Sequence, residues 1–189
     1  TTIGPVIGQE LRSKALVAIV SVVIMIILFV AFAFRQVSEP VSSWKYGMIA
    51  IVALLHDILI PVGVFAVLGY LFGAEIDILF VMALLAILGY SVNDTIVVFD
   101  RVRENLKNNL EREKIEPFVD VVGRYLEQTF ARSINTSLTT LFVLLSLFIL
   151  GGDATKNFAL VLIAGVLAGT YSSLFLATPL LVTLTDTSK

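Results

Sequence analysis

Five apolar runs, each about as long as a bilayer is thick, constrain this sequence more than any other feature. A helix needs about 20 apolar residues to cross the roughly 30 Å of hydrocarbon in a membrane. Of the 189 residues, 58% are hydrophobic and 15% are charged, whereas about one quarter of a soluble domain is charged. We therefore predict an all-α membrane protein, a single transmembrane domain over 1–189 with five spans at 15–34, 47–72, 78–99, 133–150 and 157–184.

Lys and Arg residues predict how these spans are oriented. Residues 101–132 form a long hydrophilic segment with seven of the 13 basic residues, which predicts a cytoplasmic loop by the positive-inside rule. Five spans place the termini on opposite sides, with the N-terminus outside and the C-terminus cytoplasmic. Only Arg12, Lys14 and Lys156 among the basic residues then lie outside. An exported N-terminus, and a first residue other than Met, lead us to expect further chain upstream.

The segment 101–132 is predicted to be a helical loop. Val102, Leu106 and Leu110 recur at four-residue spacing and extend the third helix past the membrane. Further along, apolar side chains on one face of residues 118–129 predict a second helix. This pattern fits a helix that lies in the membrane interface, and equally one that packs against the end of the bundle.

Polar side chains inside the spans gather at one depth. At about 1.5 Å per residue, four of the five helices bring polar groups to the zone from the midplane to the inner leaflet. Unrelated polar residues on separate helices would not be expected to lie at the same depth in the membrane. The predicted polar zone consists of His56, Asp57, Ser91, Asn93, Asp94, Arg132, Asn135, Thr139, Thr170, Ser172 and Ser173.

Asp94 is the member of this zone that is hardest to explain by structure alone. A carboxylate inside the bilayer costs about 2.5 kcal/mol or more and is a candidate functional group, so we predict an ion-coupling role for Asp94 beside Asn93. Arg132 is either a boundary cation that extends towards the interface or a partner that lowers the cost of an ionised Asp94. His56 and Asp57 form either a proton relay or a satisfied polar pair.

The hydroxyl residues of the zone have a structural alternative as well. Ser and Thr in spanning helices commonly bond their own backbone or a neighbouring helix, which contributes about 0.6 kcal/mol. Gly165 and Gly169, four residues apart, predict a surface where another helix approaches closely.

An enzyme is not predicted. Asp57 and Asp94 on neighbouring helices could suggest an intramembrane aspartic protease, whose mechanism uses two carboxylates that share a proton. However, the glycine-bracketed aspartate of those proteases is missing, because Asp94 lies between Asn93 and Thr95. The sequence also has no Cys, no cluster at metal-ligand spacing and no phosphate-binding loop. We expect no bond-cleaving activity, no metal, no cofactor and no nucleic-acid partner.

Three motifs resemble one family of membrane proteins. Residues 89–105, GYSVNDTIVVFDRVREN, resemble the signature of SecF, the smaller half of the SecD-SecF protein-export complex. Residues 55–57 (LHD) and 169–173 (GTYSS) agree with that family in order and spacing. The resemblance covers nearly the whole chain and implies half of a resistance-nodulation-division-like transmembrane domain. Such a half has six spans, with an exported domain between the first two, so we expect the first helix and the exported domain to be absent from this chain.

The resemblance also implies a function and a set of partners. Subunits of this kind use an ion gradient, of protons or sodium, to support late-stage translocation of preproteins. Carried over by motif, Asp94 would be the titrating carboxylate and Arg132 its cationic counterpart. The implied partners are SecD, the SecYEG channel, YajC, the preprotein and the lipid bilayer, and the implied location is a bacterial or archaeal cytoplasmic (inner) membrane.

Two other functions stay open at this level. A proton-coupled exporter of small molecules or lipids from the same superfamily would use a similar bundle and carboxylate. A purely structural bundle that scaffolds a channel would leave Asp94 without a role.

Overall fold

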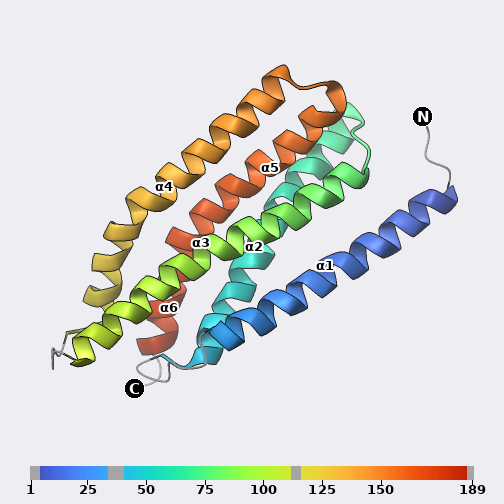
Figure 1. Cartoon of the computed structure of the whole chain (residues 1–189). Coiled ribbons are helices and arrows are strands. Elements are labelled where there is room, and N and C mark those ends of the chain that lie inside the picture. The colour runs from blue at the N-terminus through green and yellow to red at the C-terminus, as the bar shows by residue number, and fades with distance from the viewer. Residues whose placement is uncertain (1–4, 34–40, 112–115, 187–189) are drawn as a thin grey trace.

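The structure, a computed structural model, describes residues 5–33, 41–111 and 116–186. Every regular element in these ranges is helical, and five of the helices are long and apolar enough to cross a membrane. The predicted class, an all-α bundle of five transmembrane helices, is therefore confirmed (Figure 1).

The helices extend beyond most of the predicted spans. The predicted spans 47–72, 78–99, 133–150 and 157–184 lie wholly inside observed helices, and 15–34 does so up to residue 33. The elements are α1 (Pro5–Ala33), α2 (Ser43–Phe72), α3 (Ile78–Glu111), α4 (Phe118–Leu150), and a final rod of α5 (Asp153–Ser172), the π-helical turn η1 (Ser173–Ala177) and α6 (Thr178–Asp186).

Glycine ends two of these helices. Gly73 follows α2 with a φ of 69°, in the left-handed region that glycine adopts most easily, and its N–H donates to the Gly69 carbonyl at 3.0 Å. Gly151 follows α4 and donates to the Leu147 carbonyl at 2.9 Å. Both glycines lie at the same end of the bundle, where the chain turns from one span to the next (Figure 1).

The segment 101–132 is largely helical, in line with the predicted extension of the third helix and the predicted second helix. α3 and α4 run through most of it as extensions of two spanning helices. Val121 and Val122 on α4 are buried in one cluster with Val102 on α3. The helix at 118–129 therefore packs against the end of the bundle, which is one of its two predicted interpretations.

α5 is the central helix of the bundle. It packs against α2, α3 and α4, whereas α1 lies at one edge along α2 and α3 and is mostly exposed (Figure 1). α3 and α5 run in the same direction, because the connections from α2 to α3 and from α4 to α5 lie at the same end. α1 begins at that end and α6 finishes at the other, as five spans require.

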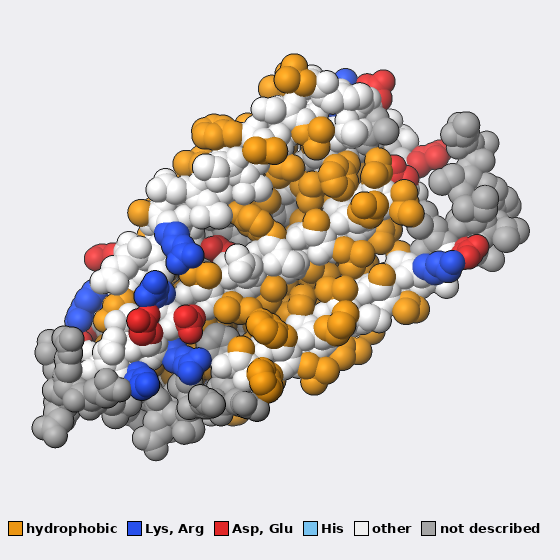
Figure 2. Space-filling model, viewed as in Figure 1, with side chains coloured by type: hydrophobic (Ala, Val, Ile, Leu, Met, Phe, Trp, Pro, Cys, Tyr) orange, Lys and Arg blue, Asp and Glu red, His pale blue; other side chains and the backbone are white. Residues whose placement is uncertain are grey.

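Charged side chains gather at the two ends of the bundle, and the middle is largely apolar (Figure 2). At one end, an open pocket at the end of α3 is lined by Asp100, Arg101, Arg103, Glu104 and Lys107. We call this the basic end, and its cytoplasmic placement stays a prediction. Four of the basic residues used for that prediction, Arg35, Arg112, Lys114 and Lys189, lie outside the described residues.

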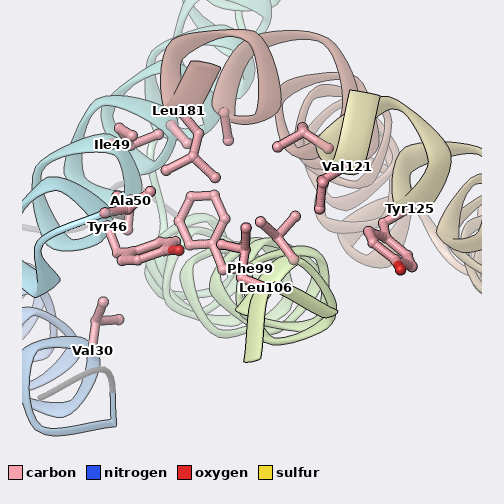
Figure 3. Close-up of a cluster of buried hydrophobic side chains, with 14 residues drawn as sticks. Val30, Tyr46, Ile49, Ala50, Phe99, Leu106, Val121, Tyr125 and Leu181 are labelled. Atoms are coloured by element: carbon pink, nitrogen blue, oxygen red, sulfur yellow. The ribbon is translucent and has the colours of Figure 1, made fainter. Parts of the chain in front are cut away.

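Two clusters of buried apolar side chains fill the core at different heights. In the basic-end cluster, the rings of Tyr46 and Phe99 meet edge to face with centroids 5.2 Å apart (Figure 3). Their neighbours include Ile49 on α2 and Leu181 on α6. The second cluster, called the opposite-end cluster, consists of Phe65, Phe80, Ala83, Leu84, Ile87 and Val161.

Candidate functional site

Polar side chains occupy a layer between the two apolar clusters, which we call the polar belt. Along α3, Ile87 belongs to the opposite-end cluster, Ser91 and Asp94 to the belt, and Phe99 to the basic-end cluster. The same layers recur along α2 in the reverse direction and along the last rod, where Val161 is in the opposite-end cluster and Leu181 on α6 is in the basic-end cluster. The members of the belt are His56, Asp57, Tyr90, Ser91, Asp94, Ser133, Ser137, Thr170, Ser172 and Ser173.

Asp57 lies at the centre of the belt and is 0% exposed. Its Oδ2 accepts hydrogen bonds from the hydroxyls of Ser91 on α3 and Ser172 on α5, the latter at 2.7 Å. Its Oδ1 accepts from Nδ1 of the neighbouring His56 at 2.9 Å. Three donors from three helices thus satisfy a carboxylate that is costly to bury without partners. The His56–Asp57 hydrogen bond is compatible with both interpretations of the pair, the satisfied polar contact and the proton relay.

Asp94 is the second carboxylate of the belt and is partly exposed. Its Oδ1 accepts from the Ser133 hydroxyl of α4 at 2.9 Å, and its Oδ2 from the Ser173 hydroxyl at 2.5 Å. Hydrogen bonds to an ionised carboxylate are stronger than those between neutral groups. The preceding residue, Asn93, is exposed on the surface of α3.

The two serines that reach Asp57 and Asp94 from the last rod are consecutive. Ser172 is the last residue of α5 and Ser173 the first of the π-helical turn η1. Pro179 follows soon after this turn and has no N–H to donate, which explains why regular α-helical bonding is interrupted here. The Thr178 hydroxyl donates to the Ser173 carbonyl at 2.9 Å and satisfies part of the interrupted backbone.

A chain of hydroxyl groups runs through the belt beside these carboxylates. The Thr170 hydroxyl lies 2.7 Å from the Val166 carbonyl, to which it can donate, and 2.5 Å from the Ser137 hydroxyl. The Ser137 hydroxyl is in turn hydrogen-bonded to the Tyr90 hydroxyl at 3.1 Å. α3, α4 and α5 are joined in this way by hydrogen bonds between hydroxyl groups.

Close packing between α3 and α5 sets the spacing of the belt. A Cβ atom on Gly165 would lie 2.3 Å from two side-chain atoms of Ile87, and one on Gly169 would lie 3.4 Å from the Ser91 Cβ. One turn further on, Ser173 meets Asp94. The glycine pair is thus a close-approach surface, as predicted, and it is used by α3 of the same chain.

On α4 the inward-facing polar residues differ from those singled out in the sequence. Asn135 and Thr139 are exposed, and the Thr139 hydroxyl donates to the Thr136 carbonyl at 2.8 Å. Ser133 and Ser137 are buried instead. Their signal in the sequence is a series of small residues four apart, Thr129, Ser133 and Ser137, along one face of the helix.

The structure does not pair Arg132 with Asp94. Arg132 is exposed on α4, and the described residues provide no ion pair for its guanidinium group. It directly precedes Ser133, which binds Asp94. The described residues also contain no group of three or more His, Asp and Glu side chains arranged as metal ligands.

These features define a class of protein: a multi-pass α-helical membrane protein in which two carboxylates lie in a hydroxyl-rich layer between apolar layers. Residues 1–187 match the family described as "Protein export membrane protein SecD/SecF, C-terminal". The chain belongs to this family.

Individual relatives agree with this assignment. The chain is 50% identical over 182 residues to a "Protein translocase subunit SecF" of Thermobaculum terrenum, covering 96% of this chain and 55% of the relative. It is 42% identical over 181 residues to a "Protein translocase subunit SecDF" of Thermus thermophilus, covering 96% of this chain and 22% of the relative. The chain thus spans about half the length of the SecF relative.

A solved structure shares the fold. The crystal structure of SecDF from Thermus thermophilus, described as a translocon-associated membrane protein, superposes with a TM-score of 0.84 at 39% identity. The match covers 98% of this chain and 24% of that chain. A second SecDF structure, in a form called super-membrane-facing, gives a TM-score of 0.79 at 38% identity.

Proposed function

We propose that this chain is the ion-coupling transmembrane part of a SecF-type subunit, which uses a proton or sodium gradient to support late-stage export of preproteins. Membership of the SecD/SecF family supports the export role. The five-helix bundle supports placement in a membrane. On this proposal the chain acts as an auxiliary subunit of the translocation machinery and catalyses no bond cleavage.

The observation that carries the proposal is the setting of Asp94. Its carboxylate lies in the span of α3 and is held by hydroxyls from two other helices, yet it is partly exposed. A fully buried carboxylate could not exchange an ion with water, and an unsupported one would be costly in the membrane. A serine hydroxyl both donates and accepts, so Ser133 and Ser173 can serve Asp94 with or without a bound proton.

Arg132 is assigned a role as the cationic counterpart of Asp94 during the transport cycle. It directly precedes Ser133 on α4, and adjacent positions on a helix lie about 100° apart, so a rotation of α4 would turn Ser133 away from the carboxylate and bring Arg132 towards it. A cation that approaches Asp94 favours its ionised form and so promotes release of the bound ion. Asn93, exposed beside Asp94, is assigned to the path by which the ion arrives.

The partner that covers this open face is proposed to be SecD. Exposed polar residues of α3 and α4, Asn93, Asn135 and Thr139, would be costly against lipid and are better placed against a second helical bundle. Ion sites of transporters with repeated halves lie near the midplane where the halves meet. The SecYEG channel, YajC and the preprotein complete the proposed assembly, in a bacterial or archaeal cytoplasmic membrane with the basic end inside.

The experiment is an Asp94→Asn substitution in the full-length subunit with its partner. Asparagine keeps the shape but cannot be ionised, so gradient-stimulated export into membrane vesicles should be lost while the complex still assembles. Asp100→Asn is the matched control, because Asp100 lies on the same helix, is 63% exposed and is outside the belt. Normal gradient-stimulated export by Asp94→Asn would refute the proposal.

A further inference from the structure

Asp57 is a buried acidic group to which the proposed function gives no task. It is 0% exposed, and among the described residues its only ion-pair partner is His56. Its remaining donors are the neutral hydroxyls of Ser91 and Ser172. These hydrogen bonds satisfy the carboxylate oxygens, but the hydroxyl donors bring no opposite charge to them.

A direct structural link joins Asp57 to Asp94. Ser172 binds Asp57 and Ser173 binds Asp94, and these serines are adjacent along one helical rod. Both serines are 0% exposed. A displacement of one serine therefore moves the other. Because both are buried, this movement is passed on through protein contacts and not through solvent.

Each serine hydroxyl has two acceptors but only one proton. Ser172 lies 2.7 Å from Oδ2 of Asp57 and 3.2 Å from the Gly169 carbonyl. Ser173 lies 2.5 Å from Oδ2 of Asp94 and 3.1 Å from the Thr170 carbonyl. When Asp94 takes up a proton, its own O–H can donate to Ser173, and the Ser173 proton then turns to the Thr170 carbonyl. The bond that held the ionised carboxylate is replaced, and no proton leaves the serine.

The backbone at this link is suited to move. η1 starts at Ser173, and π-helical turns are irregular segments that are frequent at functional sites. The Ser173 carbonyl accepts from the Thr178 hydroxyl at 2.9 Å, a side-chain bond that can lengthen more easily than a continuous helical ladder. A change at Ser173 is therefore passed to Ser172 and to Asp57.

We propose that Asp57 is a positioning residue that responds to the protonation state of Asp94 through the Ser172–Ser173 pair. This inference rests on the proposed function of Asp94. The two carboxylates are coupled through these serines, because each carboxylate accepts a hydrogen bond from one of them. Coupling of this kind is reciprocal, so Asp57 also sets how readily Asp94 exchanges its ion.

The other ionisable groups around this pair come from each neighbouring helix. α2 contributes His56, which binds Asp57, and α3 contributes Tyr90, which binds Ser137. α4 brings Arg132 next to Ser133, and α5 brings Tyr171, whose ring centroid is 6.1 Å from that of His56. The controls below therefore leave all four groups in place.

The test is infrared difference spectroscopy of the full-length subunit in complex with its partner, reconstituted in bilayers and taken through a change of pH. Asp94→Asn and Asp57→Asn identify the bands that belong to each carboxyl group. In the unmodified protein, the band of Asp57 should change when Asp94 takes up its proton. In Ser172→Ala the Asp94 band should remain, while the accompanying change at Asp57 is lost.

Ion uptake into the same vesicles gives a second measurement. Ser172→Ala and Asp57→Asn should each lower the rate of gradient-driven uptake about tenfold, and the double variant should be no slower than the single ones, because both interrupt one link. Ser146→Ala is the matched control, since the Ser146 hydroxyl is exposed and donates only to the Phe142 carbonyl of its own helix. It should stay within about twofold of the parent, as changes to exposed side chains have small effects.

The outcomes separate this inference from the function of Asp94. An Asp57 band that still responds in Ser172→Ala, or a double variant about a hundredfold slower, would overturn the link. If Asp57→Asn does not fold, Ser172→Ala decides alone, because it removes one hydroxyl and leaves the carboxylate with two donors. Normal export by Asp94→Asn would instead overturn the proposed function, and the spectra would still report on the link.

Discussion

Gly165→Ala tests the contact that fixes the distance between α3 and α5. An added Cβ would lie 2.3 Å from both Cδ1 and Cγ1 of Ile87 and 2.9 Å from its Cγ2, far inside van der Waals contact. Overpacking of this kind costs about 1–3 kcal/mol in a closely packed core. Gly63→Ala is the reference, because Gly63 also lies inside a helix and nothing is within 4 Å of its added Cβ.

The predicted quantity is the difference between these two substitutions. Alanine is the better helix former at both positions by about 0.8–1.0 kcal/mol, and this gain cancels in the comparison. Gly165→Ala should therefore be about 1–3 kcal/mol less stable than Gly63→Ala. The free energy of unfolding is measured by denaturant titration in mixed micelles, with circular dichroism as the signal.

A second background shows whether Ile87 is the cause. Ile87→Ala removes all three of the atoms that the added Cβ would approach. In that background, Gly165→Ala should cost no more than Gly63→Ala, since the space is then open. The reasoning fails if Gly165→Ala is as mild as Gly63→Ala in the parent protein, or if its extra cost persists when Ile87 is alanine.

Three further predictions use substitutions elsewhere in the bundle. Because the native chain has no Cys, a cysteine at exposed Asn108 should react with an impermeant reagent only from the cytoplasm and one at Asp153 only from outside, and the reverse result would invert the orientation. A cysteine at exposed Thr139 should crosslink to the partner bundle in membranes, whereas one at Ser91, 1% exposed, should not; equal crosslinking would move the interface. Phe99→Ala should lower the free energy of unfolding by about 3–5 kcal/mol, because the ring is 0% exposed, and a loss below about 1 kcal/mol would contradict the packing of the basic-end cluster.

Much of this fold could be predicted because membrane spans are a one-dimensional property of the sequence. Length and apolar content are enough to place five helices. A carboxylate inside a span can be recognised from the sequence as a candidate functional group. The sequence alone places Asp94 and Asp57 inside spans. The position of Asp57 at the centre of the belt could not be predicted, because that depends on how α5 packs against α2 and α3.

The rotation of α4 about its axis could not be predicted. A spanning helix is apolar on all sides, so the usual contrast between a polar and an apolar face gives little guidance. Asn135 and Thr139 on one face are about as polar as Ser133 and Ser137 on the other, and polarity alone therefore could not show which face is buried. Small side chains face inward here because they allow close packing, while the more polar face stays exposed in this chain.

The helices at the basic end could be predicted from periodicity but not from composition. Residues 101–132 are rich in charge and resemble a loop in composition. Val102, Leu106 and Val121 nevertheless pack together, so the two helices support each other beyond the apolar runs. A composition window averages over the few positions that make this contact, whereas four-residue spacing preserves them.

The layered core bears on the side from which an ion would reach the belt under the proposed function. Along the bundle axis, one route is filled by Tyr46 and Phe99 and the other by Phe80 and Ile87, all of them buried. Sideways from Asp94, Asn93 is exposed on the same helix, and the carboxylate itself is partly exposed. An ion loses less solvation along a polar path than across an apolar layer. If Asp94 couples an ion as proposed, we therefore expect lateral access through the face proposed for SecD. A change in how the two bundles meet would then open one side of the membrane or the other without rebuilding either apolar cluster.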